Sequence, residues 1–254
     1  MTSPAPYRWN KAWIIGASTG IGHALAKRIA PRCKTVVVSA RSTGKLEALA
    51  RDHMQLEPQP VDVTDAAAIA ALAARIDSGD DPVDLVVISS GVWHPVKAGQ
   101  FDIEKFKDAV DVNFMGVINV LAAIVPPMVA RGSGHIAIIS SASAYRGLPN
   151  AAAYSPMKAA LLNLTESIYP QLKRAGVHIS IIVPGFVDTP LTAVNKFPMP
   201  FLMSAEEAAR RIARGLEQKR YEIAFPNRFI YLLKLMRMLP NSVFFWYINK
   251  FVLK

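Results

Sequence analysis

The stretch KAWIIGASTGIG, residues 11–22, decides the fold of this chain. Its apolar first half predicts a short buried strand, and the apolar spacing after Gly20 predicts a helix that Pro31 ends. Glycines between a strand and a helix allow a tight turn and let the backbone approach a pyrophosphate at the helix N-terminus. The spacing Gly-x3-Gly-x-Gly differs from the common dinucleotide fingerprint Gly-x-Gly-x2-Gly. An ordinary strand-to-helix loop would equally explain this turn taken alone.

Strands and helices alternate along the rest of the chain. Apolar runs predict strands at 13–16, 35–40, 59–61, 85–89, 135–140, 178–183 and 223–224. Helical patterns lie between them at 20–30, 43–52, 65–77, 102–130, 152–175 and 205–218. The unbroken apolar run 85–88 indicates a strand buried on both faces, as in a parallel sheet covered by helices. We therefore expect an α/β fold, a doubly wound sheet of seven parallel strands, with ligands at the carboxyl ends of the strands.

A second motif pairs Tyr154 with Lys158, thirteen and seventeen residues after Ser141. Positions i and i+4 of a helix share a face, so the phenol and the ammonium point the same way. An ammonium beside a phenol favours the phenolate, which predicts a lowered pKa for Tyr154 and a role in proton transfer near neutral pH. A nearby serine hydroxyl can hydrogen-bond the reacting oxygen. A Tyr-x3-Lys pair by itself is common and carries little information.

Together the motifs resemble the short-chain dehydrogenase/reductase family over residues 11–225. The matching pieces, in the family's order, are Gly16-x3-Gly20-x-Gly22, Asp62-Val63, Ser90-Gly91, Asn113, Ser141, Tyr154-x3-Lys158, and Pro184-Gly185 with Thr189. The resemblance implies a single Rossmann-type catalytic domain at 1–225 and a nicotinamide-dependent oxidoreductase acting on a carbonyl or an alcohol. It also implies that Tyr154 is the acid/base, that Ser141 binds the substrate oxygen and that Lys158 stabilises the phenolate. Asn113 would hold a water on the proton path.

The resemblance also implies a set of cofactor-binding residues. They are Gly16, Ser18, Thr19, Gly20, Ile21, Gly22, Arg41, Ser42, Asp62, Val63, Ser90, Gly91, Tyr154, Lys158, Pro184, Gly185, Val187 and Thr189. Ala40 stands where family members that use NAD carry an acid for the ribose 2′-hydroxyl, and Arg41 follows it. A guanidinium pairs with a phosphate through two hydrogen bonds, which favours NADP(H) over NAD(H). A solvated arginine in a loop is the alternative.

Several of these positions leave alternatives open. Asp62 could instead cap the turn before the helix expected at residue 65, and Asn113 could bond back to its own helix. Ser90 stands where the family carries an asparagine that ties neighbouring strands, so the hydrogen bonds at this position differ from the family's pattern. Ser140 and Ser141 face opposite ways if the strand ends between them, and the family's spacing to the tyrosine selects Ser141.

The segment 191–203 lies where the family carries its substrate lid. It is rich in aromatic residues and methionine and has no acid, which suggests an apolar substrate such as a steroid, a retinoid or a keto-lipid. Further candidates for the pocket wall are Trp93, His94, Tyr145 and Phe186, each of which a place in the core would also explain.

The C-terminal extension, residues 226–254, has a composition of its own. No acidic residue follows Glu222, and the basic residues are Arg228, Lys234, Arg237, Lys250 and Lys254. Pro240-Asn241 divides the extension into two helices, and no apolar run approaches the roughly 20 residues of a spanning helix. Such a segment could lie on an anionic membrane surface, contact another subunit, or form a flap over the active site.

Composition sets the remaining expectations. With 254 residues, 52% of them hydrophobic, the chain can bury one substantial core. One cysteine, Cys33, excludes an internal disulfide, and with no secretory signal a cytoplasmic protein is expected, with possible peripheral membrane association. The net charge of +10 matches no nucleic-acid motif. We expect no metal site, and a homodimer or homotetramer. A non-catalytic nucleotide sensor or scaffold of the same fold is the alternative, against which the complete catalytic set argues.

Overall fold

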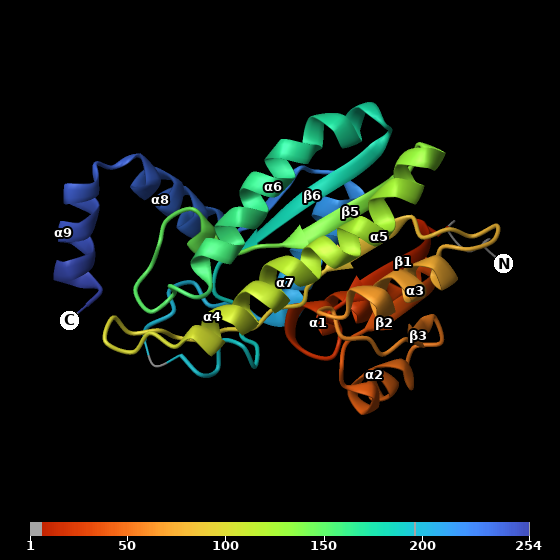
Figure 1. Cartoon of the computed structure of the whole chain (residues 1–254), viewed down its shortest axis with the longest axis horizontal. Helices are drawn as coiled ribbons and strands as arrows, with labels where there is room; N and C mark the ends of the chain where they lie inside the picture. The colour runs from red at the N-terminus through yellow and green to blue at the C-terminus, as the bar shows by residue number, and fades with distance from the viewer. Residues whose placement is uncertain (1–6, 196, 254) are drawn as a thin grey trace.

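A computed structural model describes residues 7–195 and 197–253, and its centre is one sheet of seven parallel strands (Figure 1). The strands are β1 (Trp9–Ile15), β2 (Cys33–Ser39), β3 (Leu56–Pro58), β4 (Leu85–Ile88), β5 (Gly134–Ile139), β6 (Val177–Pro184) and β7 (Glu222–Phe225). Their order, β3-β2-β1-β4-β5-β6-β7, confirms the predicted doubly wound sheet. Residues 1–6, Lys196 and Lys254 lie outside the described residues, and so do the start of the 1–225 domain, one lid position and the last basic charge.

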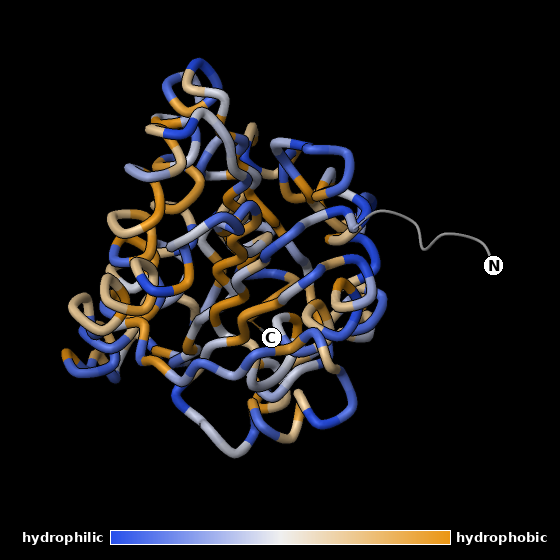
Figure 2. The backbone as a smooth tube through the Cα atoms, turned by 90° about the vertical axis from the view of Figure 1, so that its right-hand side faces the viewer, coloured by the Kyte–Doolittle hydropathy of each residue, from blue (hydrophilic) through white to orange (hydrophobic). Residues whose placement is uncertain are grey.

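Helices cover both faces of the sheet. The helices before the C-terminal extension are α1 (Gly20–Ile29), α2 (Thr43–Ala50), α3 (Ala66–Ile76), α4 (Ile103–Val110), α5 (Gly116–Arg131), α6 (Ser155–Arg174) and α7 (Ala205–Glu217). One core lies between the sheet and α3, α5 and α6, and the other lies under α1, α2 and α7. Figure 2 shows hydrophobic residues gathered in the central strands and hydrophilic ones in the outer turns.

Strand β1 shows why the sheet is buried on both faces. Trp13 and Ile15 point into the core under α3 and α5, whereas the intervening Ile14 points into the core under α1 and α7. Ile15 pairs in register with Ser39 of β2 and with Ile88 of β4. The loops that follow these three strands therefore leave the sheet at one edge, at the point where the strand order reverses.

Three predicted elements differ from the observed ones. Strand β1 begins at Trp9, four residues before its predicted start. Strand β3 lies three residues earlier than predicted, because Leu56–Pro58 pairs in register with β2. The predicted residues Gln59 and Val61 still donate to the carbonyls of Val38 and Ala40, just beyond the end of this strand. The single helix predicted at 102–130 is divided by a π-helical turn at Asp111–Met115. The stretch Ile103–Arg131 is long and apolar enough to cross a bilayer. Here its residues Val117, Leu121 and Ile124 are buried in the core.

The C-terminal extension forms the two predicted helices, α8 (Asn227–Met238) and α9 (Asn241–Phe251), and they separate at Pro240. Helix α8 packs onto the body through Phe229, Ile230, Leu233 and Met236. Helix α9 stands at the far end of the molecule beside the C-terminus (Figure 1), and its buried side chains are Phe244 and Ile248.

Candidate active site

A cavity of about 890 Å³ lies at the carboxyl edge of the sheet. It is bounded by the loops that follow β1, β2, β4, β5 and β6, by the start of α6 and by the C-terminal extension. The predicted cofactor residues that line it are Gly16, Ser18, Thr19, Gly20, Ile21, Arg41, Ser42, Asp62, Val63, Ser90, Gly91, Tyr154, Lys158, Pro184, Gly185, Val187 and Thr189. Segments that are distant in the sequence thus meet at the place expected for a ligand of this fold.

The glycine turn after β1 is shaped by close backbone contacts. Gly16 has a φ of +85°, and a Cβ there would lie 2.6 Å from the amide nitrogen of Ser90. Gly22 does not line the cavity: a Cβ there would lie 2.3 Å from the carbonyl oxygen of Gly16, so this glycine lets α1 pack against the turn. The side chain of Thr19 makes no capping hydrogen bond, and the first turn of α1 carries no acid. The amide groups of this turn can therefore bind an anion.

The loop after β2 presents positive charge. Arg41 and Ser42 are exposed at the cavity, and Lys45 lines it one helical turn later. Lys45 was missed from the sequence, although its place in the first turn of the helix that follows Arg41 could have indicated it. In the neighbouring loop after β3, the carboxylate of Asp62 accepts hydrogen bonds from the amide (3.0 Å) and the hydroxyl (2.9 Å) of Thr64. The turn-capping alternative for Asp62 is thus observed, in a residue that also lines the cavity.

Tyr154 and Lys158 lie together at the start of α6. The amide of Lys158 donates to the carbonyl of Tyr154 at 3.1 Å, and the Lys158 Nζ lies 5.6 Å from the centre of the Tyr154 ring. The Ser140 hydroxyl donates to the carbonyl of Lys158 at 2.8 Å. The Ser141 hydroxyl oxygen accepts from the amide and the hydroxyl of Ser143, at 3.2 and 3.1 Å, and lies close enough to Tyr154 to affect its pKa. The two adjacent serines therefore have separate partners, as the alternation of side chains at a strand end predicts, and Ser141 is the one that meets the tyrosine.

Burial dominates the protonation of both groups. It raises the pKa of Tyr154 to about 12, against the opposing effect of the hydrogen bond with Ser141. Burial also lowers the pKa of Lys158 to about 8. The prediction of a lowered tyrosine pKa is wrong for this structure, because removal from water disfavours the phenolate. Tyr154 is therefore a protonated phenol at neutral pH and can donate a proton.

Asn113 lies in the π-helical turn and is fully buried. Its side-chain oxygen accepts from the amide of Val92 at 3.0 Å, and its side-chain nitrogen donates to the carbonyl of Val92 at 3.1 Å. The alternative that it bonds back to its own helix is wrong. A Cβ placed on Gly91 would lie 3.0 Å from the Asn113 Oδ1 and 3.6 Å from the Lys158 Nζ. Asn113 and Lys158 therefore both lie beside Gly91.

The loop after β4 also fits a polar ligand. The Ser90 Oγ and the Trp93 Nε1 are buried, line the cavity, and have no hydrogen-bond partner among the described residues. The Ser89 amide donates to the carbonyl of Ile15 at 2.8 Å, so backbone joins the strands where the family uses an asparagine. Together with the glycine turn and the free amides of α1, these groups suit a dinucleotide.

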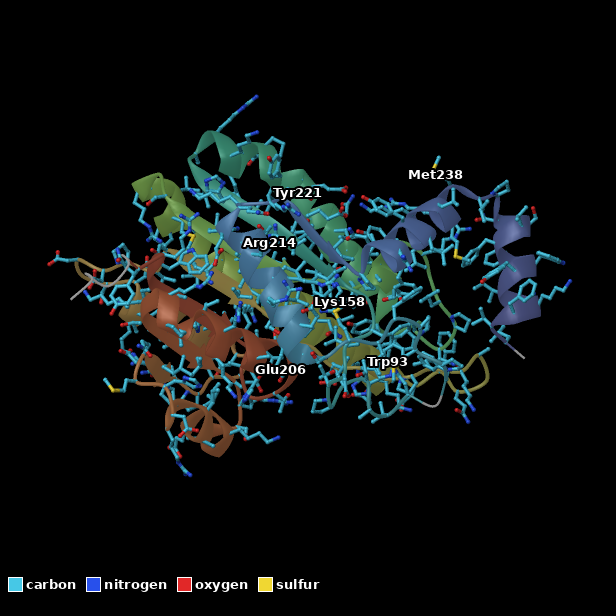
Figure 3. The ribbon with its side chains drawn as sticks, turned by 180° about the vertical axis from the view of Figure 1, so that it is seen from behind. Trp93, Lys158, Glu206, Arg214, Tyr221 and Met238 are labelled. Atoms are coloured by element: carbon cyan, nitrogen blue, oxygen red, sulfur yellow. The ribbon has the colours of Figure 1, made fainter. Side chains whose placement is uncertain are left out.

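Two of the four predicted wall residues line the cavity. Phe186 packs against Phe197 and Phe229, with ring centres 6.0 and 5.6 Å apart. Trp93 meets the ring of Tyr154 edge-on at 5.2 Å and lies near Lys158 (Figure 3).

The other two wall residues were predicted wrongly, because neither lines the cavity. His94 instead pairs with Asp108 on α4, with its Nε2 2.5 Å from the carboxylate. Tyr145 is buried, and its hydroxyl donates to Glu222 at 2.5 Å. Each side chain finds a polar partner away from the cavity, and sequence spacing does not reveal such a partner.

The C-terminal extension supplies wall residues that sequence reasoning missed. They are Phe229, Leu232, Leu233, Met236, Tyr247, Ile248, Phe251, Val252 and Leu253. The apolar spacing Phe229, Leu233, Met236 could have indicated a helix face turned toward the body. The extension thus packs onto its own domain at the cavity, which is the flap alternative. The charged side chains of the cavity lie where it meets the carboxyl ends of the strands. Where the cavity meets the C-terminal extension, the described lining residues are uncharged.

Comparison with known proteins gives consistent matches. The family model described as short chain dehydrogenase matches residues 10–197. An uncharacterised oxidoreductase from Myxococcus xanthus is 36% identical over 245 residues, covering 94% of this chain and 96% of that protein. An uncharacterised oxidoreductase from Staphylococcus haemolyticus is 34% identical over 209 residues, covering 82% and 90%. The Myxococcus alignment covers more of this chain than residues 1–225 comprise, so it reaches into the extension.

Solved structures agree in fold. A short chain dehydrogenase from Burkholderia cenocepacia in complex with NADP has a TM-score of 0.80 at 23% identity, covering 93% of this chain and 97% of that one. A short-chain dehydrogenase from Sphingobium yanoikuyae in complex with NADPH has a TM-score of 0.78 at 23% identity, covering 92% and 97%. At these identities the likeness shows the fold alone.

Proposed function

Because this chain belongs to the short-chain dehydrogenase family and is an oxidoreductase, we propose that it interconverts a carbonyl and an alcohol on a lipophilic small molecule with NADP(H). The observation that carries the proposal is the arrangement of one cavity. Ser141, Tyr154 and Lys158 stand at its polar end, and aromatic and aliphatic side chains line its other end. Residues 1–225 form the catalytic domain in this proposal, and residues 226–254 form an extension that completes the pocket.

The residues of the chain handle the proton and the position of the substrate. A bound nicotinamide supplies the hydride to the carbonyl carbon in reduction, or accepts it in oxidation. Tyr154 donates its phenolic proton to the carbonyl oxygen, and Ser141 hydrogen-bonds that oxygen. The ammonium of Lys158 stabilises the resulting phenolate. Asn113 maintains the proton path through which Tyr154 is protonated again. In oxidation each proton transfer has the opposite direction, and the phenolate of Tyr154 accepts the proton of the alcohol.

The cofactor preference rests on the loop after β2. Arg41, Ser42 and Lys45 would hold a 2′-phosphate, and Ala40 places no acid against it. The glycine turn and the amides of α1 would hold the pyrophosphate, Asp62 and Val63 the adenine, and the backbone of Val187 the carboxamide. Thr189 would offer its hydroxyl to the cofactor. Two structures of similar fold contain NADP or NADPH, which supports the same choice. Reduction is the proposed direction, because cells hold the NADP pool largely reduced.

The assembly and location belong to the same proposal. From family membership alone, the protein is a cytoplasmic homodimer or homotetramer whose partner is its small-molecule substrate, with no role for nucleic acid. The basic charge and exposed apolar side chains of the extension add a peripheral contact with an anionic membrane surface.

The substrate class is tested by a series of methyl ketones of increasing chain length, with NADPH oxidation as the readout. We expect kcat/KM to rise about fourfold for each added methylene that enters the apolar end, since a buried methylene contributes about 0.8 kcal/mol. Keto acids of matched length serve as the control and should be poor substrates, because no cationic side chain among the described residues lines that end. Equal efficiency for both series would contradict a lipophilic substrate. NADPH binding without turnover across both series would indicate the nucleotide sensor instead.

A further inference from the structure

The mouth of the cavity is an apolar rim. Leu232, Phe251, Val252 and Leu253 line the cavity and are at the same time 45–56% exposed. Phe201, on the lid segment, also lines the cavity and is 49% exposed. One set of side chains is therefore shared between the inside of the pocket and the outer surface. A substrate entering here would pass over hydrocarbon rather than over polar groups.

The outer faces of α8 and α9 continue this apolar surface. Tyr231, Leu235 and Met238 of α8 are exposed, and so are Phe245 and Trp246 of α9. Figure 3 shows Met238 pointing away from the body at the end of α8. A helix that is apolar on its inner and its outer face needs a partner for the outer one. Exposed apolar surface of this extent marks an interaction site.

Positive charge borders this surface. Arg228, Arg237 and Lys250 are exposed, and no acidic residue occurs after Glu222. The Lys250 Nζ lies 5.0 Å from the centre of the Trp246 ring, so an apolar ring and a cation occupy adjacent positions on α9. Lys234 differs, because its ammonium pairs with Glu222 and holds α8 to β7. Aromatic rings with flanking lysine and arginine side chains are the composition of segments that lie in the interface of an anionic bilayer.

A second copy of the chain fits the exposed faces of α8 and α9 less well than an anionic bilayer does. In a two-fold interface the same patch faces itself, so Arg228, Arg237 and Lys250 would face a surface with the same positive charge and no acidic residue from the extension. Anionic lipid headgroups supply the missing negative charge, and acyl chains accept Phe245 and Trp246.

We infer that α8, α9 and the rim dock onto an anionic bilayer, and that the pocket takes its substrate directly from the lipid. This inference rests on the proposed function and narrows its substrate to carbonyl or alcohol compounds that dissolve in bilayers. Such a molecule carries one polar group on an apolar body. The polar group leads toward Tyr154, and the body remains among Phe229, Met236 and Phe251.

Binding is tested without turnover. The full-length protein should co-sediment with phosphatidylcholine vesicles that contain phosphatidylglycerol, but not with phosphatidylcholine alone, and added salt should weaken the binding. The double substitution Phe245→Glu/Trp246→Glu should reduce the bound fraction at least about tenfold, because neither side chain lines the cavity and both would place charge at the lipid boundary. Met54→Glu is the matched control, since Met54 is 98% exposed in the turn before β3, and it should leave binding unchanged.

Delivery from lipid is tested with the same variants. For a long-chain ketone carried in anionic vesicles, Phe245→Glu/Trp246→Glu should lower the rate of NADPH oxidation about tenfold or more, in step with the lost binding. The rate with a short, water-soluble ketone should stay unchanged. If the full-length protein does not co-sediment with anionic vesicles, the inference is overturned. The inference is also overturned if Phe245→Glu/Trp246→Glu binds vesicles as the wild type does but changes oligomeric state. That result would show that the two side chains form a contact between subunits. Vesicle binding without activity toward either ketone would leave docking intact and refute the proposed function.

Discussion

At the scale of single residues, Lys158 is held from two sides by the end of β5. Its ammonium donates to the carbonyl of Ile139 at 3.0 Å, and its own carbonyl accepts from Ser140 at 2.8 Å. Both partners belong to the sheet edge, so the sheet sets the position of the ammonium beside Tyr154. With a pKa of about 8, Lys158 is charged in most molecules at neutral pH and can still exchange its proton.

Arg41 permits a prediction at the same scale. Arg41→Asp should lower the ratio of kcat/KM with NADPH to that with NADH by about 10- to 100-fold. It removes charge-assisted hydrogen bonds of about 1.5–3 kcal/mol to the 2′-phosphate and offers a carboxylate to the ribose hydroxyl. Steady-state kinetics with both cofactors measure the ratio.

Arg51→Asp is the matched control for this change. Arg51 is exposed at the end of α2 and does not line the cavity, so the same change of charge there should leave the ratio within about twofold of the wild type. An unaltered ratio in Arg41→Asp would remove Arg41 from cofactor selection.

The sequence predicted which chemical groups meet, and it did not predict their protonation. The spacing of Ser141, Tyr154 and Lys158 placed all three in one cavity, because strand alternation and helical periodicity are local properties. The pKa of Tyr154 depends on how much protein surrounds it, which no local pattern encodes. His94 and Tyr145 show the same limit, since their carboxylate partners come from other elements.

At the scale of elements, β5 and β6 are joined by a buried histidine. The His135 Nε2 lies 2.7 Å from the hydroxyl of Ser180, which itself donates to the carbonyl of Arg220 at 2.6 Å. Ser180 must therefore accept from the histidine, which requires a proton on Nε2. Burial lowers the pKa of His135 to about 3, helped by the nearby charges of His178 and Lys219.

This histidine makes folding sensitive to acid. The folded pKa lies below the unfolded value of 6.5, so the unfolded chain binds more protons and stability is lost as the pH falls from about 6.5 toward 3. Between pH 7 and pH 5 His135 should account for about 2 kcal/mol of lost unfolding free energy, at 1.36 kcal/mol per unit. Urea unfolding at the two pH values should show this loss in the wild type, and His135→Gln should show correspondingly less. Equal losses in the two proteins would mean that His135 does not control the acid response.

Element boundaries were predictable where propensity and packing agree. The strands of the central sheet and the break at Pro240 appeared as expected, because apolar runs and proline act locally. The π-helical turn at Asp111–Met115 was not predictable, because it accompanies the pairing of Asn113 with Val92, a contact across 21 residues. The shift of β3 has a similar origin, since its partner strand decides the register.

At the scale of the whole molecule, one cavity has a polar end and an apolar end, which different parts of the chain supply. The sheet edge contributes glycine turns, a helix N-terminus and buried polar groups, whereas the lid and the extension contribute hydrocarbon. Helix α8 is fastened to the sheet by the contact of Lys234 with Glu222, which also accepts from Tyr145. The composition of the extension indicated its apolar and basic character in advance. Its position over the cavity follows only from the packing of Phe229, Leu233 and Met236.

The central claim is that Tyr154 is the proton donor in an NADPH-dependent reduction within this cavity, and Tyr154→Phe tests it most directly. The measurement is kcat/KM for a long-chain ketone, with NADPH affinity measured in parallel by fluorescence. We predict a loss of about 10²–10⁴-fold in kcat/KM, because general acid catalysis is removed while the ring remains against Trp93. NADPH affinity should stay within about threefold, since each tenfold change would require 1.4 kcal/mol of lost contacts. Activity within about tenfold of the wild type, with NADPH still bound, would contradict the account.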